Sequence, residues 1–397
     1  MILYDPSLNM AFRDYGIMLP IAPDRPSRIL EHLTRTAPAV AGGGAFSAFP
    51  GPVLDMAGAR AALGLPPDPA VNRGDLERVH QGEFIAGLYG SGPEEDGLVK
   101  ALLNAYELID AEGRPRRYEP GRAAKPLSAL FKIILAQAEG TYLACRLALA
   151  GQPVADRAGP GFCYYLGGGM HHARYDSGAG FCLINDIVIA ARRLQAEGRA
   201  RLIWIIDVDA HKGDGTAELI RFARERGELG TAGSRDGAAE ILNLSVHMAR
   251  GWPLDPETLE QSRPDRAPCV SADVEIPVEA GEEDRYIPAL RQGFGRLESL
   301  SAAWTANTGG CGIGCGGGGR FPRPGLAIVV DGADPYEHDG LPSSGLLRLT
   351  LEQCLERDRL ICNFLQERGI PSAWIMAGGY GERAWEPAAE FLAALAS

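Results

Sequence analysis

The sequence predicts an α/β fold, with one domain over residues 1–397 and a central, mostly parallel sheet flanked by helices. Short apolar runs typical of buried strands alternate with longer segments of helical periodicity. Four of these runs end directly in polar or glycine-rich residues, and ligand sites in open α/β sheets lie beyond the carboxyl ends of the strands. No Ser/Pro-rich linker or charge run separates the four segments, so a single domain is expected.

The elements follow in chain order. Residues 1–5 begin the chain as an apolar first strand, and two early segments, 23–33 and 98–108, are expected to be helices. Further strands are predicted where apolar residues run together, at 162–166, 202–206, 241–246, 326–330 and 373–376. Further helices are predicted where apolar residues recur at helical spacing, at 127–150, 184–197, 217–226 and 346–367. Because strand, loop and helix repeat, the sheet should be covered on both faces.

The composition excludes some classes of partner. With 46% apolar residues the chain can build a large core. The net charge of −12 argues against a broad nucleic-acid surface. The same charge favours cationic substrates, although it equally serves solubility.

The eight cysteines are scattered, and only Cys311 and Cys315 lie close together, without the second pair of a zinc ribbon. No signal peptide or membrane-spanning segment is evident, so we expect free thiols, no membrane and a cytoplasmic location. Residues 309–319 contain eight glycines and two cysteines. They are expected to form a flexible surface loop, and a flap over a site is the less favoured alternative.

The most informative segment is residues 206–215, Ile-Asp-Val-Asp-Ala-His-Lys-Gly-Asp-Gly. Asp207, Asp209 and His211 alternate after a buried strand, which places them on one side of an extended segment. Carboxylates and an imidazole in this arrangement suit a divalent cation such as Zn²⁺. A solvated loop at the end of a strand is the alternative.

A second motif lies in residues 167–186, Gly-Gly-Gly-Met-His-His-Ala followed by Gly-Ala-Gly-Phe-Cys-Leu-Ile-Asn-Asp. The adjacent His171 and His172 follow another strand, and imidazoles suit proton transfer because they titrate near neutral pH. Asp334 follows the strand at 326–330, and Tyr380 lies on a glycine turn after the strand at 373–376. Asp334 or Tyr380 alone would be weak evidence for a site. Together, the four polar segments that follow the strands at 162–166, 202–206, 326–330 and 373–376 indicate one site.

Taken in order, these motifs resemble the histone deacetylase superfamily of zinc-dependent amidohydrolases, which includes bacterial acetylpolyamine amidohydrolases and acetoin-utilisation-type proteins. The resemblance covers roughly residues 126–385. It implies an α/β fold related to that of arginase, and three zinc ligands, Asp209, His211 and Asp334. It also implies that Asp207 pairs with His171 and that Asp214 orients His172.

The resemblance implies a mechanism in which His172 is the base, His171 stays cationic and Tyr380 donates to the developing oxyanion. Gly180 and Phe181 would form one wall of a substrate tunnel, and Trp252 would replace the phenylalanine usual on the opposite wall. A structural K⁺ or Na⁺ is also implied, bound by Ser245, Val246 and the backbone of Asp207, Asp209 and His211.

The chain departs from the family pattern at Lys212, where His, Gln or Asn is usual, and at Ala377, where glycine is commoner. Alternation should point the Lys212 side chain away from the metal ligands. The glycine-rich segment 309–319 has no counterpart.

The sequence therefore predicts a zinc-dependent deacetylase that removes an acyl group, expected to be acetyl, from acyl-lysine in a protein or peptide or from an acetylpolyamine. One alternative is an arginase-like ureohydrolase with two manganese ions. Its Asp-x-His-x-Asp motif does not fit, because residue 213 is glycine and the next acid is Asp214. The other alternative is a non-enzymatic acyl-ligand binding protein of the same fold. Acyl length, substrate size and oligomeric state are left open by the sequence.

Overall fold

A computed structural model describes residues 1–36, 52–92, 96–110, 112–151, 159–230, 239–255, 269–308 and 323–396. The glycine-rich segment 309–319, with Cys311 and Cys315, lies outside the described residues. The loop and flap expected there stay predictions.

The centre of the molecule is an eight-stranded sheet with the order β2-β1-β3-β8-β7-β4-β5-β6. Every pair of neighbouring strands is parallel. The strands are β1 (Ile2–Leu3), β2 (Val53–Leu54), β3 (Phe162–Tyr165), β4 (Leu202–Asp207), β5 (Glu240–Met248), β6 (Val274–Val278), β7 (Leu326–Asp331) and β8 (Ser372–Met376). The predicted α/β fold with a parallel sheet is confirmed.

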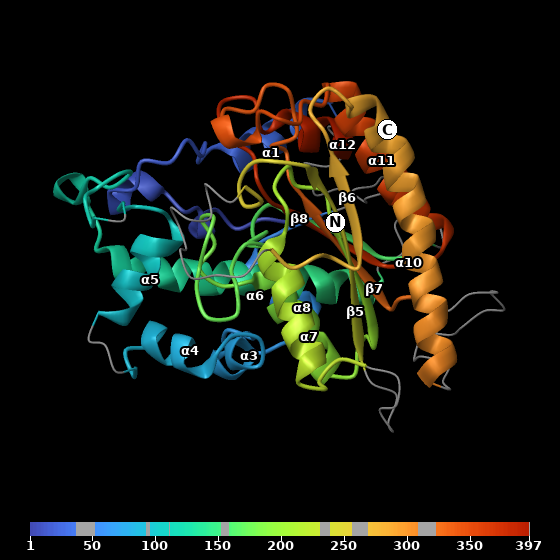
Figure 1. Ribbon diagram of the computed structural model, residues 1–397, viewed down its shortest axis with the longest axis horizontal. Helices are drawn as coiled ribbons and strands as arrows, with labels where there is room; N and C mark the ends of the chain where they lie inside the picture. The colour runs from blue at the N-terminus through green and yellow to red at the C-terminus, as the bar shows by residue number, and fades with distance from the viewer. Residues whose placement is uncertain are drawn as a thin grey trace.

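Helices surround this sheet (Figure 1). They are α1 (Arg25–Thr36), α2 (Met56–Ala62), α3 (Arg73–Glu77), α4 (Gly82–Leu88), α5 (Gly97–Ala105), α6 (Leu130–Ala150), α7 (Asp186–Ala196), α8 (Asp214–Glu225), α10 (Tyr286–Thr308), α11 (Leu351–Glu367) and α12 (Glu386–Ala396).

Alternation along the strands divides the core between the two faces of the sheet. In β4, Ile203 and Ile205 belong to one hydrophobic cluster, together with side chains of α6, α7 and α8. Leu202, Trp204 and Ile206 belong to the other, together with side chains of α1, α10, α11 and α12. In Figure 1, α7 and α8 accordingly lie on one side of the strands and α10 on the other. Both faces are buried, as a parallel sheet requires.

The helical segment Leu127–Ala150, which contains α6, is long and apolar enough, by length and composition, to cross a membrane. Of its most apolar window, 72% is buried inside the protein. It lies against α7, β3 and β8, and core helices of water-soluble proteins pass the same test.

Several boundaries differ from the sequence prediction for local reasons. The helix expected at 346–367 begins at Leu351, because the Thr350 hydroxyl accepts a hydrogen bond from Gln353 N while the Gln353 side chain accepts one from Thr350 N. Neither strand β2 nor strand β6 was predicted. Pro277 of β6 is tolerated because β6 lies at the edge of the sheet. The helices α2, α3, α4, α10 and α12 were also not predicted. The single-domain organisation over residues 1–397 stays a prediction.

Candidate active site

The polar segments singled out in the sequence follow four strands that are neighbours in the sheet. Strands β3, β8, β7 and β4 are consecutive in the strand order, and all are parallel. Their carboxyl ends therefore open at the same edge, where sites of such sheets lie. This topology brings the His171-His172 loop, the segment after Asp207, Asp334 and Tyr380 together.

The structure brings together a compact, buried group of three possible metal ligands, Asp209, His211 and Asp334, which we call the metal group. One ligand atom from each lies within 4.8 Å of the others. Nδ1 of His211 is 2.8 Å from Oδ2 of Asp334 and 3.3 Å from Oδ1 of Asp209. Among the residues that the structure describes, no other group of three His, Cys, Asp or Glu side chains meets this spacing.

The chemistry of this donor set fits a divalent cation. Burial raises the pKa of Asp334, and the neighbouring Asp209 carboxylate raises it further. Two buried carboxylates so close together repel each other, and a cation between them would remove that cost. Two carboxylates and one imidazole also leave a position for water and substrate, as catalytic zinc sites require. The group can hold a metal ion such as Zn²⁺.

His171 and His172 each have a carboxylate on Nδ1. His171 Nδ1 lies 2.8 Å from Oδ2 of Asp207, and His172 Nδ1 lies 2.9 Å from Oδ1 of Asp214. All four side chains are buried. The second carboxylate oxygen of Asp214 accepts a short hydrogen bond from Arg174, which is also buried. The pairs predicted from the sequence are thus present in the fold.

The two imidazoles differ in their electrostatics. Burial alone would lower the pKa of His171, but the charges of Asp207 and Asp209 outweigh it and raise the pKa to about 9. Burial and the neighbouring His171 charge lower the pKa of His172 to about 3, against the opposing effect of Asp214. Near neutral pH, His171 is therefore cationic and His172 neutral.

The loop that carries both histidines is held by Asn185 and Asp186, to which the sequence analysis gave no role. Asp186 accepts hydrogen bonds from the backbone N–H groups of Gly169 and Met170, at 3.0 and 2.7 Å. The Asn185 amide donates to the backbone carbonyl of His171 at 3.3 Å, while its oxygen caps α7. Both residues belong to the second sequence motif, residues 167–186, so the motif could have pointed to them as functional residues.

Arg357 is a further residue that the sequence analysis missed. It is 1% exposed and donates to the backbone carbonyls of Val208 and Gly332, at 3.2 and 2.9 Å. These carbonyls lie next to the segments that carry Asp209 and Asp334, so Arg357 ties the two ends of the metal group together. In the sequence, Arg357 looks like any other charged residue of a helix, so no local pattern indicates its role.

Tyr380 lies at the same edge, on a glycine turn that is fastened to the metal group. The N–H of the neighbouring Gly378 donates to Oδ2 of Asp209 at 2.9 Å. The ring of Tyr380 lies 6.1 Å from that of Phe181, centroid to centroid. Burial raises the pKa of Tyr380 well above its ordinary value, and the nearby acids Asp334 and Asp209 add to the effect. The phenol is therefore a neutral donor.

The predicted tunnel residues line one cavity with the catalytic candidates. A cavity of about 890 Å³ is lined by Gly180, Phe181 and Trp252 together with His172, His211 and Tyr380. The ring of Trp252 meets His172 edge-on, with centroids 4.5 Å apart. A Cβ at Gly180 would lie 2.3 Å from the Trp252 ring, so only glycine fits there. Phe181 has φ 65°, in the left-handed region that favours glycine, and such strain is concentrated at functional sites.

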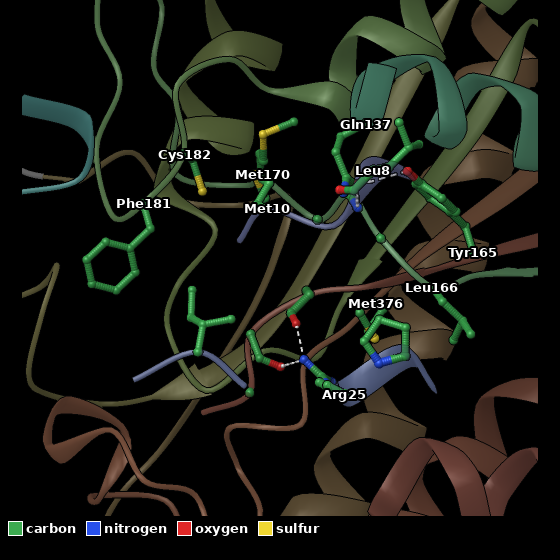
Figure 2. A pocket seen from close by; sticks show the side chains of 18 of the residues that line it. Leu8, Met10, Arg25, Gln137, Tyr165, Leu166, Met170, Phe181, Cys182 and Met376 are labelled. Carbon is green, nitrogen blue, oxygen red and sulfur yellow. Dashed lines mark hydrogen bonds between the residues drawn. The ribbon is translucent and has the colours of Figure 1, made fainter. Parts of the chain in front are cut away.

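A second cavity, of about 160 Å³, adjoins the site, since Asp209, His211 and Tyr380 line it. Its lining also includes Leu8, Met10, Gln137 and Met376 (Figure 2). Arg25, which the sequence analysis missed, borders it. Arg25 Nη1 donates to the carbonyls of Ala377 and Gly378, at 2.8 and 3.1 Å. No described residue accepts from its buried Nε and Nη2. Buried donors without a partner are rare, and these two belong to a side chain that lines the cavity.

Ser245 and Val246 lie on β5, where Ser245 is paired in register with Asp207. The hydroxyl of Ser245 is buried and has no partner among the described residues. A monovalent cation would give the Ser245 hydroxyl oxygen a partner. The K⁺ or Na⁺ site stays a prediction, and the buried hydroxyl is the one observation that supports it.

Lys212 points away from the metal group, as alternation predicted. Its ammonium makes a short contact with Glu275 on β6, which also lies 3.1 Å from Nε2 of His247. The lysine is therefore neutralised on the far side of the segment and does not compete with a metal ion.

The family model described as the histone deacetylase domain matches residues 20–301 of this sequence, which is more than half of the chain. An uncharacterised protein of Picosynechococcus sp. is 27% identical over 243 residues, which make up 61% of each chain. The acetoin utilization protein AcuC of Staphylococcus aureus is 54% identical over 52 residues, 13% of each chain. The alignments thus span less than two thirds of these curated relatives.

Among solved structures, an acetylpolyamine aminohydrolase from Burkholderia pseudomallei matches with a TM-score of 0.59. The superposition covers 99% of this chain and 98% of that one, at 16% identity, which establishes the likeness of the fold. Together with the domain match, these findings show that the chain belongs to the histone deacetylase family.

Proposed function

We propose that this protein is a zinc-dependent deacetylase that hydrolyses the amide of an acylated primary amine. The observation that carries the proposal is the convergence of three groups on one cavity, which His211, His172 and Tyr380 line. These are the Asp209-His211-Asp334 group, two histidines each paired with a carboxylate, and the Tyr380 phenol. Family membership supports the same activity.

Asp209, His211 and Asp334 would hold the metal ion, which, when bound, polarises the amide carbonyl and makes water more acidic. The protein itself supplies the proton transfers. His172 is neutral near neutral pH, so it can take a proton from the attacking water and later return it to the leaving amine. Asp214 holds Nδ1 of His172 and so directs Nε2 as the atom that exchanges the proton.

His171 and Tyr380 would stabilise charge. His171 keeps its proton because Asp207 and Asp209 surround it, so it contributes a fixed positive charge beside the reacting amide. Tyr380 keeps its proton because it is buried among acids, so it can donate a hydrogen bond to the developing oxyanion.

Arg25 would receive the carboxylate product. The cavity that Arg25 borders is also lined by Asp209, His211 and Tyr380, so an acid released at these residues would adjoin it. The two Arg25 nitrogens that lack an acceptor among the described residues would offer donors to that acid. Inhibition by acetate should accordingly weaken in Arg25→Met, measured as the acetate inhibition constant. Unchanged inhibition would exclude this role.

The substrate expected is an acyl group, most simply acetyl, on a thin aliphatic amine chain. Acyl-lysine in a peptide or protein and acetylpolyamines both present this group to the cavity bounded by Phe181 and Trp252. The arginase-like alternative is disfavoured because Asp214 binds His172, so no second metal-ligand group forms among the described residues. A non-enzymatic role is disfavoured because both histidine pairs and the tyrosine are in place.

A turnover panel tests the proposal. The zinc-loaded protein would be assayed with an acetyl-lysine peptide, peptides of increasing acyl length, and acetylputrescine. We expect hydrolysis of at least one of them and its loss in Tyr380→Phe. No turnover of any member by a folded, metal-loaded protein would refute the deacetylase activity. The cytoplasmic location stays a prediction.

A further inference from the structure

The turn at residues 339–344 contacts both Tyr380 and His211, and it supplies none of the proposed catalytic side chains. It contains a short 3-10 helix, Pro342–Ser344. Leu341 and Ser343 of this turn line the same cavity as His211 and Tyr380. Its contacts reach in both directions, toward the tyrosine and toward the histidine.

On one side, the turn binds both backbone polar groups of Tyr380. Oδ2 of Asp339 accepts a hydrogen bond from Tyr380 N at 2.7 Å. Gly340 N donates to the carbonyl of Tyr380 at 2.9 Å. The backbones pack closely here, since a Cβ at Gly340 would lie 3.2 Å from Cα of Gly381. The backbone of Tyr380 is thereby fixed by two consecutive residues 40 or more positions earlier in the chain.

Asp339 also closes the turn itself. Its Oδ1 accepts from Leu341 N at 2.8 Å and from the Ser344 hydroxyl at 2.9 Å. A side chain that only capped its own turn would need no more than these two bonds. The bond from Oδ2 to Tyr380 is additional and joins two loops that follow different strands. Asp339 therefore couples the shape of the turn to the position of the tyrosine.

On the other side, the turn reaches the metal group. The hydroxyl of Ser343 lies 3.2 Å from Nε2 of His211. Nδ1 of the same ring faces Asp334 and Asp209. A hydroxyl that accepts from Nε2–H leaves the Nδ1 lone pair free toward the metal position, and such outer partners orient metal-binding histidines.

We propose that the 339–344 turn is a positioning element, in which Asp339 holds the phenol of Tyr380 over the reacting carbonyl and Ser343 holds the imidazole of His211 toward the metal. The inference rests on the proposed function. One rigid segment thereby sets the distance between the oxyanion donor and the metal ligand. A shift of about 1 Å between such groups can cost about 100-fold in rate.

A double-mutant cycle tests the Asp339 part. In Asp339→Asn, kcat on the best substrate should fall about 10- to 100-fold, while KM changes little. Because Asp339 acts through the tyrosine, Asp339→Asn should add little further loss in a Tyr380→Phe background. Asp55→Asn is the matched control, since Asp55 also accepts a local backbone hydrogen bond, from Gly58 N, but does so as the N-cap residue of α2. Full additivity of the two losses would overturn the proposal.

Metal affinity tests the Ser343 part without using activity. Ser343→Ala should bind zinc about 10- to 100-fold more weakly in a chelator competition, as is typical when an outer partner of a ligand is removed. Ser299→Ala, on the exposed side of α10, is the control and should bind zinc like the wild type. Unchanged affinity in Ser343→Ala would also overturn the proposal.

If Asp339→Asn does not fold, Ser344→Ala replaces it in the cycle, because it keeps the Asp339 carboxylate and removes a hydroxyl that lies 2.9 Å from its Oδ1 and 2.7 Å from the carbonyl of Leu341. It should give a smaller, equally non-additive loss. If the wild type turns over no substrate, the proposed function fails, yet the turn can still be tested. Hydrogen exchange of the peptide containing Tyr380 should then speed up in Asp339→Asn and stay unchanged in Asp55→Asn. An unchanged rate in both would refute the Asp339 part.

Discussion

The Nδ1 atom of His172 lies 2.9 Å from Oδ1 of Asp214, and Asp214 is the first residue of helix α8. The carboxylate that orients the proposed base is thus placed by a helix that packs on the sheet. A negative charge at the first turn of a helix is itself favourable. The geometry of the base therefore depends on the fold of α8 as well as on the histidine loop.

Replacing the two histidines should affect turnover unequally. His172→Ala should lower kcat by more than about 100-fold, the typical contribution of a general base. His171→Ala should be harmful to a lesser degree, because it removes a fixed charge and not the proton carrier. Steady-state kinetics with a metal analysis of each variant would check this. Equal, wild-type turnover in both variants at full metal content would make the pair structural.

Removing one ligand should release the metal. Asp334→Ala should lose most of the bound zinc and most of the activity, since only three protein side chains form the group. Elemental analysis of the purified protein gives the readout, and Asp55→Ala serves as a carboxylate control outside the site. The assignment of Asp334 fails if the variant keeps one tightly bound metal ion per chain.

Tyr380→Phe should lower kcat by about 10²–10³-fold, the usual effect of removing one oxyanion donor. Substrate affinity should change little, because the donor acts on charge that develops in the transition state. The ring that packs against Phe181 is kept, so folding should be unaffected. Kinetics on the best substrate and binding of a hydroxamate ligand separate the two effects. A wild-type kcat would exclude Tyr380 as the donor.

Trp252→Ala should widen the tunnel beside His172. The loss of an aromatic wall is expected to raise KM about tenfold for an acetylated amine, in line with the energy of one pocket contact. Bulkier acyl groups should be tolerated better than by the wild type. Trp252→Phe keeps an aromatic edge and should behave nearly normally. Comparing KM across the acyl series for both variants decides whether Trp252 is a tunnel wall.

Glu275 should make stability depend on acid pH. Burial alone would raise its pKa, but hydrogen bonds from His247 and Lys212 and the Lys212 charge lower it from 4.5 to about 2. A carboxyl with a lowered pKa stabilises the fold above its ordinary pKa, and the stabilisation is lost as the pH falls toward the lowered value. Glu275→Gln should therefore be less stable near neutral pH, and its melting temperature should approach that of the wild type between pH 4.5 and 2.

Thermal melts over this pH range measure the effect of Glu275. The control is Glu279→Gln, because Glu279 is half-exposed and forms its ion pair with the exposed Arg250. A constant difference in melting temperature between wild type and Glu275→Gln at every pH would show that the carboxylate does not titrate in this window.

The residues of the candidate site could be predicted from the sequence on different grounds. Asp207, Asp209 and His211 could be grouped from the sequence because they alternate along one extended segment, and local spacing determines which way such side chains point. Asp334 and Tyr380 could be assigned to the same site because their segments also end apolar strands of a parallel sheet, and the resemblance to a family then implied their roles. The structure places both beside that segment.

The sequence by itself determined the parallel α/β class, the main strands and the residues at their carboxyl ends, because these depend on local periodicity. Only the tertiary structure decided that β8 and β7 lie between β3 and β4, which is what brings the four segments together. It also decided that Arg25, Arg357 and Asp339 reach the site, each from a segment far away in the chain. Such long-range contacts depend on strand order and helix packing, and the pattern of one segment does not encode them.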